Sequence, residues 1–359
     1  MSVVSNLIQF ALILMFLVLV HEAGHMYVAR WTGMRVERFS IFFGKPVASF
    51  TKGETEYAIG WLPLGGYVKI SGMTRDEDVP DEHLHRTYSR SATWKKIATI
   101  AAGPGINIVV AILAFAALFW IGVPGGDPTT QVEYVQKASP AASIGLRPGD
   151  TITAVNGIAV STGQDLRRVI EARPKQDVRV TYTRDGVAAP ITRRTTLNSE
   201  KVDGREVGRL GFGFHYDTVR FGPVAGVRES LDYTWYIVTE SGKQLGRVFV
   251  SQRAREDLQS VVGVGAVYNE IANEGLLVII QFIGVLSLAL AVFNLIPLPP
   301  LDGGHILFAV IEHVRGRPLP RAVFERASII GLALLLMVMV FTLQNDIIDI
   351  RNGTVLGPR

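Results

Sequence analysis

The 359-residue sequence contains no cysteine, which excludes disulfide frameworks and metal sites built on thiolates. A metal bound by this chain must therefore take nitrogen and oxygen ligands. The sequence also has no run of Lys and Arg and no basic stretch interleaved with aromatic residues, although its formal net charge is +4. Nucleic-acid-binding surfaces normally show such patterns, so we expect no nucleic-acid partner. No internal repeat or low-complexity tract is visible.

Hydrophobic residues, in contrast, make up 48% of the chain, and the mean hydropathy is positive. This composition is typical of a membrane protein. Four apolar stretches approach or exceed the roughly 20 residues that a helix needs to cross a bilayer. They cover residues 7–28, 97–123, 276–297 and 327–343. No basic residue precedes the first stretch and no small-residue cleavage site follows it, so we expect it to be retained rather than removed as a signal peptide.

The distribution of positive charge predicts how these spans are oriented. The loop 29–96 carries eleven Lys and Arg residues, and the link between the last two spans carries four arginines, whereas residues 1–6 carry no charged side chain. Positive charge near span ends favours the cytoplasmic side. We therefore expect loop 29–96 to be cytoplasmic, and both termini and the region 124–275 to be extracytoplasmic.

Within this outer region, residues 131–215 have the pattern of a compact β-rich domain. Alternating runs at 151–155 and 178–183 are separated by Asn-Gly and Asp-Gly turns at 156–157 and 185–186, and one helix is expected at 163–172. From residue 223 to 250 apolar residues recur at helical spacing but are interrupted by charges. An amphipathic helix at the membrane interface fits this segment better than a fifth span.

The sharpest motif is H-E-A-G-H at residues 21–25, inside the first apolar stretch. Two histidines four apart on a helix lie within about 40° of one another, so His21 and His25 can share one metal ion, for which zinc is expected. Glu22 can then act as the general base that takes a proton from a metal-activated water. These side chains could instead cap a helix or reach to the interface, but three ionisable groups within one turn of a membrane helix are usually functional.

A catalytic zinc normally has three protein ligands, and the third apolar stretch offers the missing one. It ends in N-L-I-P-L-P-P-L-D-G-G-H at 294–305, where three prolines and two glycines interrupt the helix and place Asp302 at the break. Irregular backbone at membrane depth is tolerated where it lines a cavity or is buried in protein. Asp302 is our predicted third ligand; His305 competes for that role or acts as a cap or hydrogen-bonding partner. Asn294 could hold a peptide backbone or an oxyanion, or bond between helices.

With both motifs placed, the sequence resembles the site-2 protease family of intramembrane zinc metalloproteases, in particular the bacterial regulator-of-sigma-E type with a single PDZ domain. The resemblance is carried by H-E-x-x-H at 21–25 and by N-x-x-P-x-P-x-L-D-G at 294–303. It implies that His21, His25 and Asp302 bind zinc and that Glu22 is the catalytic glutamate.

Two further segments resemble family signatures. Residues 64–69, L-G-G-Y-V-K, are similar to the membrane-dipping β-hairpin of the family, and the resemblance implies that Gly65, Gly66, Tyr67 and Val68 pair with an unwound substrate segment by strand addition. An ordinary surface hairpin is the alternative. Residues 102–107, A-G-P-G-I-N, are similar to the second-span signature A-G-P-x-x-N, and we interpret them as a structural feature at a helix start softened by Gly and Pro.

The outer domain resembles a PDZ domain of the circularly permuted bacterial kind, on S-P-A-A-S-I-G-L-R-P-G-D at 139–150 followed by V-N-G at 155–157. Such a domain could accept a chain terminus by strand addition or exclude substrates with bulky ectodomains. One departure from the family lies before the third span, where this chain has V-G-V-G at 262–265 instead of Gly-Pro. The conformation of the local turn is therefore not predicted.

The predicted fold is a polytopic α-helical membrane protein with four transmembrane helices, an inserted extracytoplasmic PDZ domain of β-rich α+β type and a membrane-associated β-hairpin. The predicted domains are 1–123 with the zinc motif and the hairpin, 124–218 as the PDZ domain, 219–274 as the amphipathic linker, and 275–359 with the third ligand.

The predicted function is zinc-dependent intramembrane cleavage of single-span proteins in the bacterial plasma membrane, after their ectodomains have been trimmed. Anti-sigma factors and signal-peptide remnants are the expected substrates. A PDZ-containing scaffold with structural zinc and a metal transporter are the alternatives. Glu22 argues against the scaffold, and the lack of further carboxylates along the spans argues against the transporter.

Overall fold

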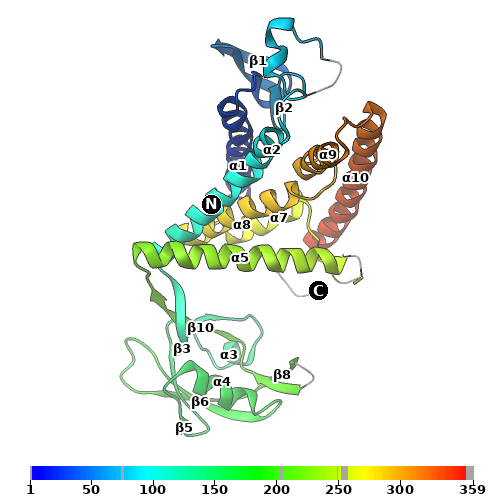
Figure 1. Ribbon diagram of the computed structural model, residues 1–359. Coiled ribbons are helices and arrows are strands. Elements are labelled where there is room, and N and C mark those ends of the chain that lie inside the picture. Colours follow the sequence, from blue (N-terminus) through cyan, green and yellow to red (C-terminus); the bar gives the residue numbers. More distant parts are fainter. Residues whose placement is uncertain (1, 74–76, 203–204, 249, 252–257, 353–359) are drawn as a thin grey trace. The chain divides into compact units, whose positions relative to one another are not determined.

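The computed structural model describes residues 2–73, 77–202, 205–248, 250–251 and 258–352, and it consists of two compact units (Figure 1). The helical unit comprises Met1–Leu118 and Pro223–Arg359. The β-rich unit comprises Phe119–Gly222. The β-rich unit is thus inserted into the sequence of the helical one.

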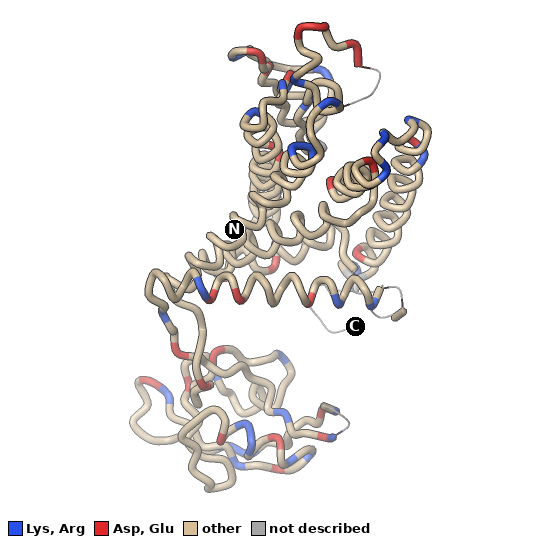
Figure 2. The backbone as a smooth tube through the Cα atoms, viewed as in Figure 1, with Lys and Arg blue, Asp and Glu red and all other residues tan. Residues whose placement is uncertain are grey.

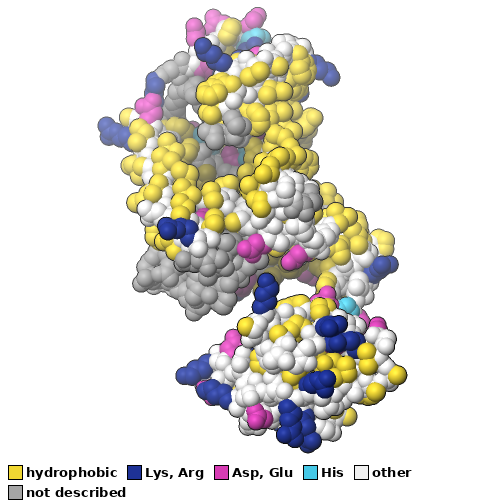
Figure 3. Space-filling model, turned by 180° about the vertical axis from the view of Figure 1, so that it is seen from behind, with side chains coloured by type: hydrophobic (Ala, Val, Ile, Leu, Met, Phe, Trp, Pro, Cys, Tyr) yellow, Lys and Arg dark blue, Asp and Glu magenta, His cyan; other side chains and the backbone are white. Residues whose placement is uncertain are grey.

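Four of the described helices are long and apolar enough to cross a membrane. They are α1 (Val3–Trp31), α2 (Thr93–Ile121), α8 (Leu276–Asn294) and most of α10 (Arg321–Asn352). Charged residues are sparse along α1 and α8 and are concentrated in the hairpin and the β-rich unit (Figure 2). Apolar side chains cover much of the helical unit (Figure 3). These helices match the four predicted spans, and their placement in a bilayer stays a prediction.

The start of α2 differs from our expectation. The helix begins at Thr93, so the A-G-P-G-I-N signature lies in its interior and not at its start, and Pro104 is inside the helix. A proline there cannot donate to the carbonyl four residues earlier and crowds it. The helix nevertheless continues through Pro104, and next to this proline it packs closely on α1. A Cβ on Gly24 of α1 would lie 2.5 Å from the Ala102 carbonyl oxygen.

The cytoplasmic loop of the prediction forms a long β-hairpin and a short 3₁₀ helix. Strand β1 (Val36–Lys52) pairs antiparallel with β2 (Thr55–Ile70), and η1 spans Asp81–Arg86. The hairpin is curled, because Phe39 of β1 pairs with both Tyr57 and Val68 of β2. The last part of β2 therefore lies along one edge of β1 and packs on α1, where Ile70 and Met26 share a buried core.

The second half of the helical unit begins with α5 (Pro223–Val248), as the amphipathic pattern predicts, and continues with α7 (Val261–Ile271). Apolar side chains of α5 such as Trp235 are exposed. The described part of the predicted linker 219–274 is thus largely helical; residues 249 and 252–257 lie outside the described residues. Helix α7 is tied to α10, because the buried Asp346 carboxylate accepts the backbone N–H groups of Ser260 and Gly263 at 2.8 and 3.0 Å.

The described part of the β-rich unit contains a six-stranded sheet and two helices. The strand order is β10-β3-β4-β6-β7, with β5 paired to β4. The bounds are β3 Val123–Val135, β4 Thr151–Val155, β5 Ile158–Ala159, β6 Asp177–Thr183, β7 Ile191–Thr196 and β10 Phe212–Val219; β8 (Asn198–Val202) and β9 (Arg205–Arg209) form a separate pair, and the helices are α3 (Pro140–Ser143) and α4 (Gly163–Glu171). Leu166 of α4, Ile152 and Val180 are fully buried in one core. The expected strands and helix are therefore present.

A buried carboxylate stabilises the loop that precedes β4. Asp150 accepts the Arg147 N–H at 2.8 Å and a two-pronged contact from the Arg184 guanidinium at 2.7 and 2.8 Å. Burial raises the pKa of the Asp150 carboxyl, but these hydrogen bonds and the positive charges outweigh burial and hold the pKa below its ordinary value. The ionised carboxylate therefore stabilises the fold at neutral pH.

We expect Asp150→Asn to lower the local free energy of unfolding of the β-rich unit by about 1–3 kcal/mol at pH 7, because the amide cannot accept the complete set of charge-assisted bonds. Since the folded-state pKa is depressed, the stabilisation is complete above the unfolded-state pKa, about 3.9, and is lost as pH falls through the folded-state value. The rate of hydrogen exchange in peptides from β4 and β6 measures this local free energy of unfolding. Equal exchange in both proteins at pH 7 would contradict it.

Candidate metal centre

Helix α1 presents two histidines one turn apart to the interior of the helical unit. His21 and His25 are each only 7% exposed, and their Nε2 atoms lie 3.2 Å apart. The four-residue spacing therefore places both ring nitrogens at one point, as the sequence predicts. An apolar helix that buries two imidazoles requires a partner for them, since uncompensated buried polar groups are costly.

That partner is the first residue of α9 (Asp302–Arg315). Asp302 Oδ2 lies 3.1 Å from His21 Nε2 and 3.4 Å from His25 Nε2. The prolines at 297, 299 and 300 end helical continuity after α8, and two glycines let the chain return closely. A Cβ on Gly303 would lie 2.3 Å from the Leu295 carbonyl oxygen, and one on Gly304 would lie 2.3 Å from the Pro299 nitrogen. The break thus delivers the carboxylate to the histidines.

The donor set fits a tetrahedral zinc ion. The three ligand atoms are separated by 3.1, 3.2 and 3.4 Å, while zinc–ligand distances of 2.0–2.1 Å imply about 3.3–3.5 Å along a tetrahedron edge. Asp302 Oδ2 is buried, and apart from the two imidazole nitrogens it has no hydrogen-bond partner among the described residues. A cation placed between these two nitrogens and this oxygen would supply the partner that the oxygen lacks. His21, His25 and Asp302 would therefore hold the zinc.

Helix α2 packs against the two histidine rings. His25 Nδ1 faces the Thr99 carbonyl oxygen at 2.9 Å, and His21 Nδ1 faces the amide of Asn107 at 3.4 Å. Both α2 residues are fully buried. A Cβ on Gly103 would lie 2.3 Å from His25 Nε2 and 2.8 Å from His21 Nε2, so only glycine leaves room for the rings.

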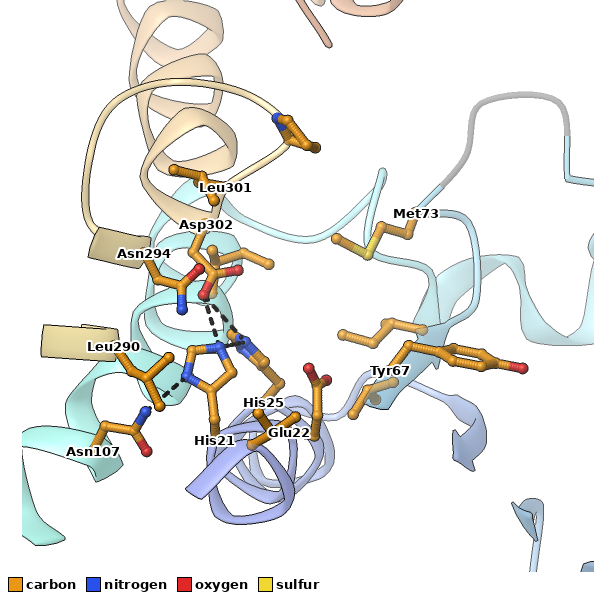
Figure 4. A pocket seen from close by; sticks show the side chains of 15 residues that line it. His21, Glu22, His25, Tyr67, Met73, Asn107, Leu290, Asn294, Leu301 and Asp302 are labelled. Atoms are coloured by element: carbon orange, nitrogen blue, oxygen red, sulfur yellow. Dashed lines mark hydrogen bonds and ion pairs between the residues drawn. The ribbon is translucent and has the colours of Figure 1, made fainter. Parts of the chain in front are cut away.

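The ligands line a cavity of about 300 Å³, and residues of α1, α2, β2, α8 and the start of α9 form its walls. Glu22, Tyr67, Val68 and Asn294 also line it. Glu22 lies on the side of the histidines that faces β2 (Figure 4). A Cβ on Gly66 would lie 3.2 Å from Glu22 Cγ, so the backbone of β2 directly adjoins the predicted general base.

The predicted residues thus fall into three groups. The structure brings His21, Glu22, His25, Asn294 and Asp302 to one cavity. The strand Gly65–Val68 runs along it, with the Tyr67 ring pointing away (Figure 4) and stacked on Phe43 at 5.4 Å. His305, the competing ligand, is not in the ligand cluster, and its ring packs on Phe324 at 5.2 Å.

Sequence reasoning missed the contribution of α2. We interpreted A-G-P-G-I-N as structural, whereas Gly103 of this motif lies against both histidines and Asn107 faces His21. The signal was present, because Gly103 and Asn107 are four residues apart and must lie on one face of a helix. What could not be read from the sequence was that this face turns toward α1.

Comparisons with known proteins show which family this chain is similar to. Peptidase family M50 matches residues 9–338 of the chain. A protein of Agrobacterium fabrum named as a zinc metalloprotease is 36% identical over 363 residues, covering 95% of each chain. Zinc metalloprotease Rip1 of Mycobacterium tuberculosis is 32% identical over 355 residues, covering 88% of this chain and 87% of its own.

A solved PDZ domain of the SdrC-like protein from Listeria monocytogenes covers 26% of this chain and 93% of its own, at 22% identity and a TM-score of 0.21. A score this low supports no conclusion about the fold. The PDZ assignment therefore continues to rest on the sequence motifs.

We expect Gly103→Ala to lower zinc affinity by at least about tenfold, in the range that disturbing the outer partners of metal ligands costs. The added methyl group would displace the histidine rings. Gly105→Ala is the matched control, because a Cβ there meets nothing within 4 Å. Zinc per chain is measured after competition with a chelator. Equal zinc retention by both variants would show that the rings do not depend on this close approach.

Proposed function

This chain belongs to peptidase family M50, the site-2 protease family, and is a metalloprotease; on this premise we propose that it cuts peptide bonds within the membrane-spanning segments of single-span proteins. The observation that carries the proposal is the position of the catalytic cavity. His21, Glu22, His25 and Asp302 line one cavity, and the histidines lie within a helix apolar enough to span the bilayer.

The chemistry follows from the groups in the cavity. Zinc, when bound, would polarise the scissile carbonyl and make water more acidic. Glu22 takes a proton from the attacking water as the new C–O bond forms, and then delivers it to the leaving nitrogen as the C–N bond breaks. Asn294, across the cavity, is suited to hold the substrate backbone or the developing oxyanion with its amide. His21, His25 and Asp302 hold the metal in place.

A helical substrate must be opened before it can be cut, and the strand Gly65–Val68 supplies a template for the opened segment. One edge of this strand pairs with β1 through Ile41 and Phe39. Among the described residues, no strand pairs with its other edge. We propose that the substrate adds to this edge as an extended strand, beside Glu22. Exposed apolar side chains on the hairpin, such as Phe50 and Trp61, suit association with the membrane.

The cellular setting follows from the charge distribution and the family. We propose a location in the bacterial plasma membrane, with the hairpin cytoplasmic and both termini extracytoplasmic. The β-rich unit would be an extracytoplasmic PDZ domain that either binds peptide or excludes bulky ectodomains. Substrates would be anti-sigma factors or signal-peptide remnants already trimmed outside the membrane, as in regulated intramembrane proteolysis.

The scaffold and transporter alternatives are less well supported. A structural zinc site needs no free carboxylate in its cavity, yet Glu22 is there. A transporter needs a chain of polar sites across the membrane, whereas the described residues contain one group of three or more clustered metal-ligating side chains.

We expect Glu22→Gln to retain about one zinc per chain and to lose cleavage by about 10²–10⁴-fold, because glutamine is similar in shape but cannot accept the proton. The assay uses purified full-length protein in detergent and a single-span substrate lacking its ectodomain. The matched control is Glu325→Gln on the exposed surface of α10. If Glu22→Gln cut as fast as wild type, Glu22 would not be the general base.

A further inference from the structure

We infer that Asn107 on α2 is a positioning residue for the zinc site, which fixes His21 in the tautomer that presents Nε2 to the metal. The inference rests on the proposed zinc chemistry and adds to it a role for the second apolar helix. It starts from the requirement that each ligating imidazole carry its proton on the nitrogen away from the metal. In both histidines here that nitrogen is Nδ1, since the Nε2 atoms face Asp302.

His25 meets this requirement through the backbone of α2. A carbonyl oxygen only accepts hydrogen bonds, so the 2.9 Å contact with Thr99 O places the proton on His25 Nδ1 and leaves the Nε2 lone pair for a metal.

His21 has no carbonyl opposite Nδ1; it has the amide of Asn107, 3.4 Å away through Nδ2, as Figure 4 shows. An amide can turn by 180° in the same space, exchanging Nδ2 and Oδ1. With Nδ2 toward the ring, His21 Nδ1 must accept and the proton moves to Nε2, which then cannot bind zinc. With Oδ1 toward the ring, Oδ1 accepts the Nδ1 proton and Nε2 is free.

The surroundings of Asn107 do not hold the amide in the orientation with Nδ2 toward the ring. The residue is fully buried, and its Oδ1 has no hydrogen-bond partner when Nδ2 faces the ring. Turning the amide pairs Oδ1 with the His21 Nδ1 proton and moves Nδ2 to the place that Oδ1 left, so the need of the metal for the Nε2 lone pair selects this orientation. The backbone of Asn107 is itself held, because Ser287 Oγ of α8 donates to its carbonyl oxygen at 2.8 Å. This contact is made to the Asn107 backbone and does not involve the amide side chain that faces His21.

A purely structural role for Asn107, as a polar contact between helices, makes a different prediction, and three variants separate the two. Asn107→Leu keeps the approximate volume but removes every polar atom. Asn107→Asp keeps the shape and leaves only acceptors, so it can still receive the His21 proton. Ser287→Ala breaks the bond between α8 and the Asn107 carbonyl but leaves the amide side chain intact.

The experiment uses full-length protein in detergent and measures zinc affinity by competition with a chromogenic chelator, and the visible spectrum after replacement of zinc by cobalt. We expect Asn107→Leu to weaken zinc affinity by about 10–100-fold and to alter the cobalt spectrum. Asn107→Asp should remain within about threefold of wild type, and Ser287→Ala should be unchanged in both measurements. Wild-type affinity in Asn107→Leu would overturn the inference.

A loss of tenfold or more in Asn107→Asp would also overturn it, and this variant decides the question even where Asn107→Leu does not fold.

Failure of the proposed function would give different results. Wild-type protein that binds zinc but cuts no single-span substrate contradicts the proposed function while the comparison of zinc affinities stands. Wild-type protein that binds no zinc contradicts both.

Discussion

The structure depends on the convergence of three ligand atoms inside an apolar helical unit. Two imidazoles and a carboxylate are expensive to bury unless they are compensated, and here their ligand atoms lie within 3.4 Å of one another. A cation at that point would turn a cost into a stabilising centre that joins α1 to α9. The other features of the site can be understood as what this convergence requires, namely a broken helix to deliver Asp302 and glycines to let the chain segments approach.

Helix α2 shows how closely the apolar helices must pack for this purpose. Gly24 of α1 and Gly103 of α2 each lie where a Cβ would overlap a neighbour. Small residues at such positions are the usual means by which membrane helices approach closely. In this chain the close approach also brings a backbone carbonyl and an amide to the far sides of the two histidine rings. Packing and metal chemistry therefore constrain the same residues.

Much of the site could be predicted from the sequence, because its residue types are rare in apolar helices. Histidines at 21 and 25 and an aspartate at a proline-rich break leave few interpretations. The partners in α2 could not be predicted, since a glycine and an asparagine in a helix have many structural uses. The predicted start of α2 was wrong because Pro104 was taken as the sign of a helix terminus, whereas it lies inside the helix. The curl of the hairpin, in which Phe39 pairs with two residues of β2, also could not be predicted, because the alternation of apolar and polar residues along a strand does not show which strands pair.

The central claim is that hydrolysis takes place inside a membrane-spanning segment. The most direct test is to reconstitute the full-length protein and a trimmed single-span substrate in lipid vesicles and to map the cut by mass spectrometry of both fragments. The account predicts a cut within the apolar segment that stops when a chelator removes the metal and returns when zinc is restored. Cuts confined to the polar residues outside the apolar segment, or cleavage indifferent to the chelator, would contradict it.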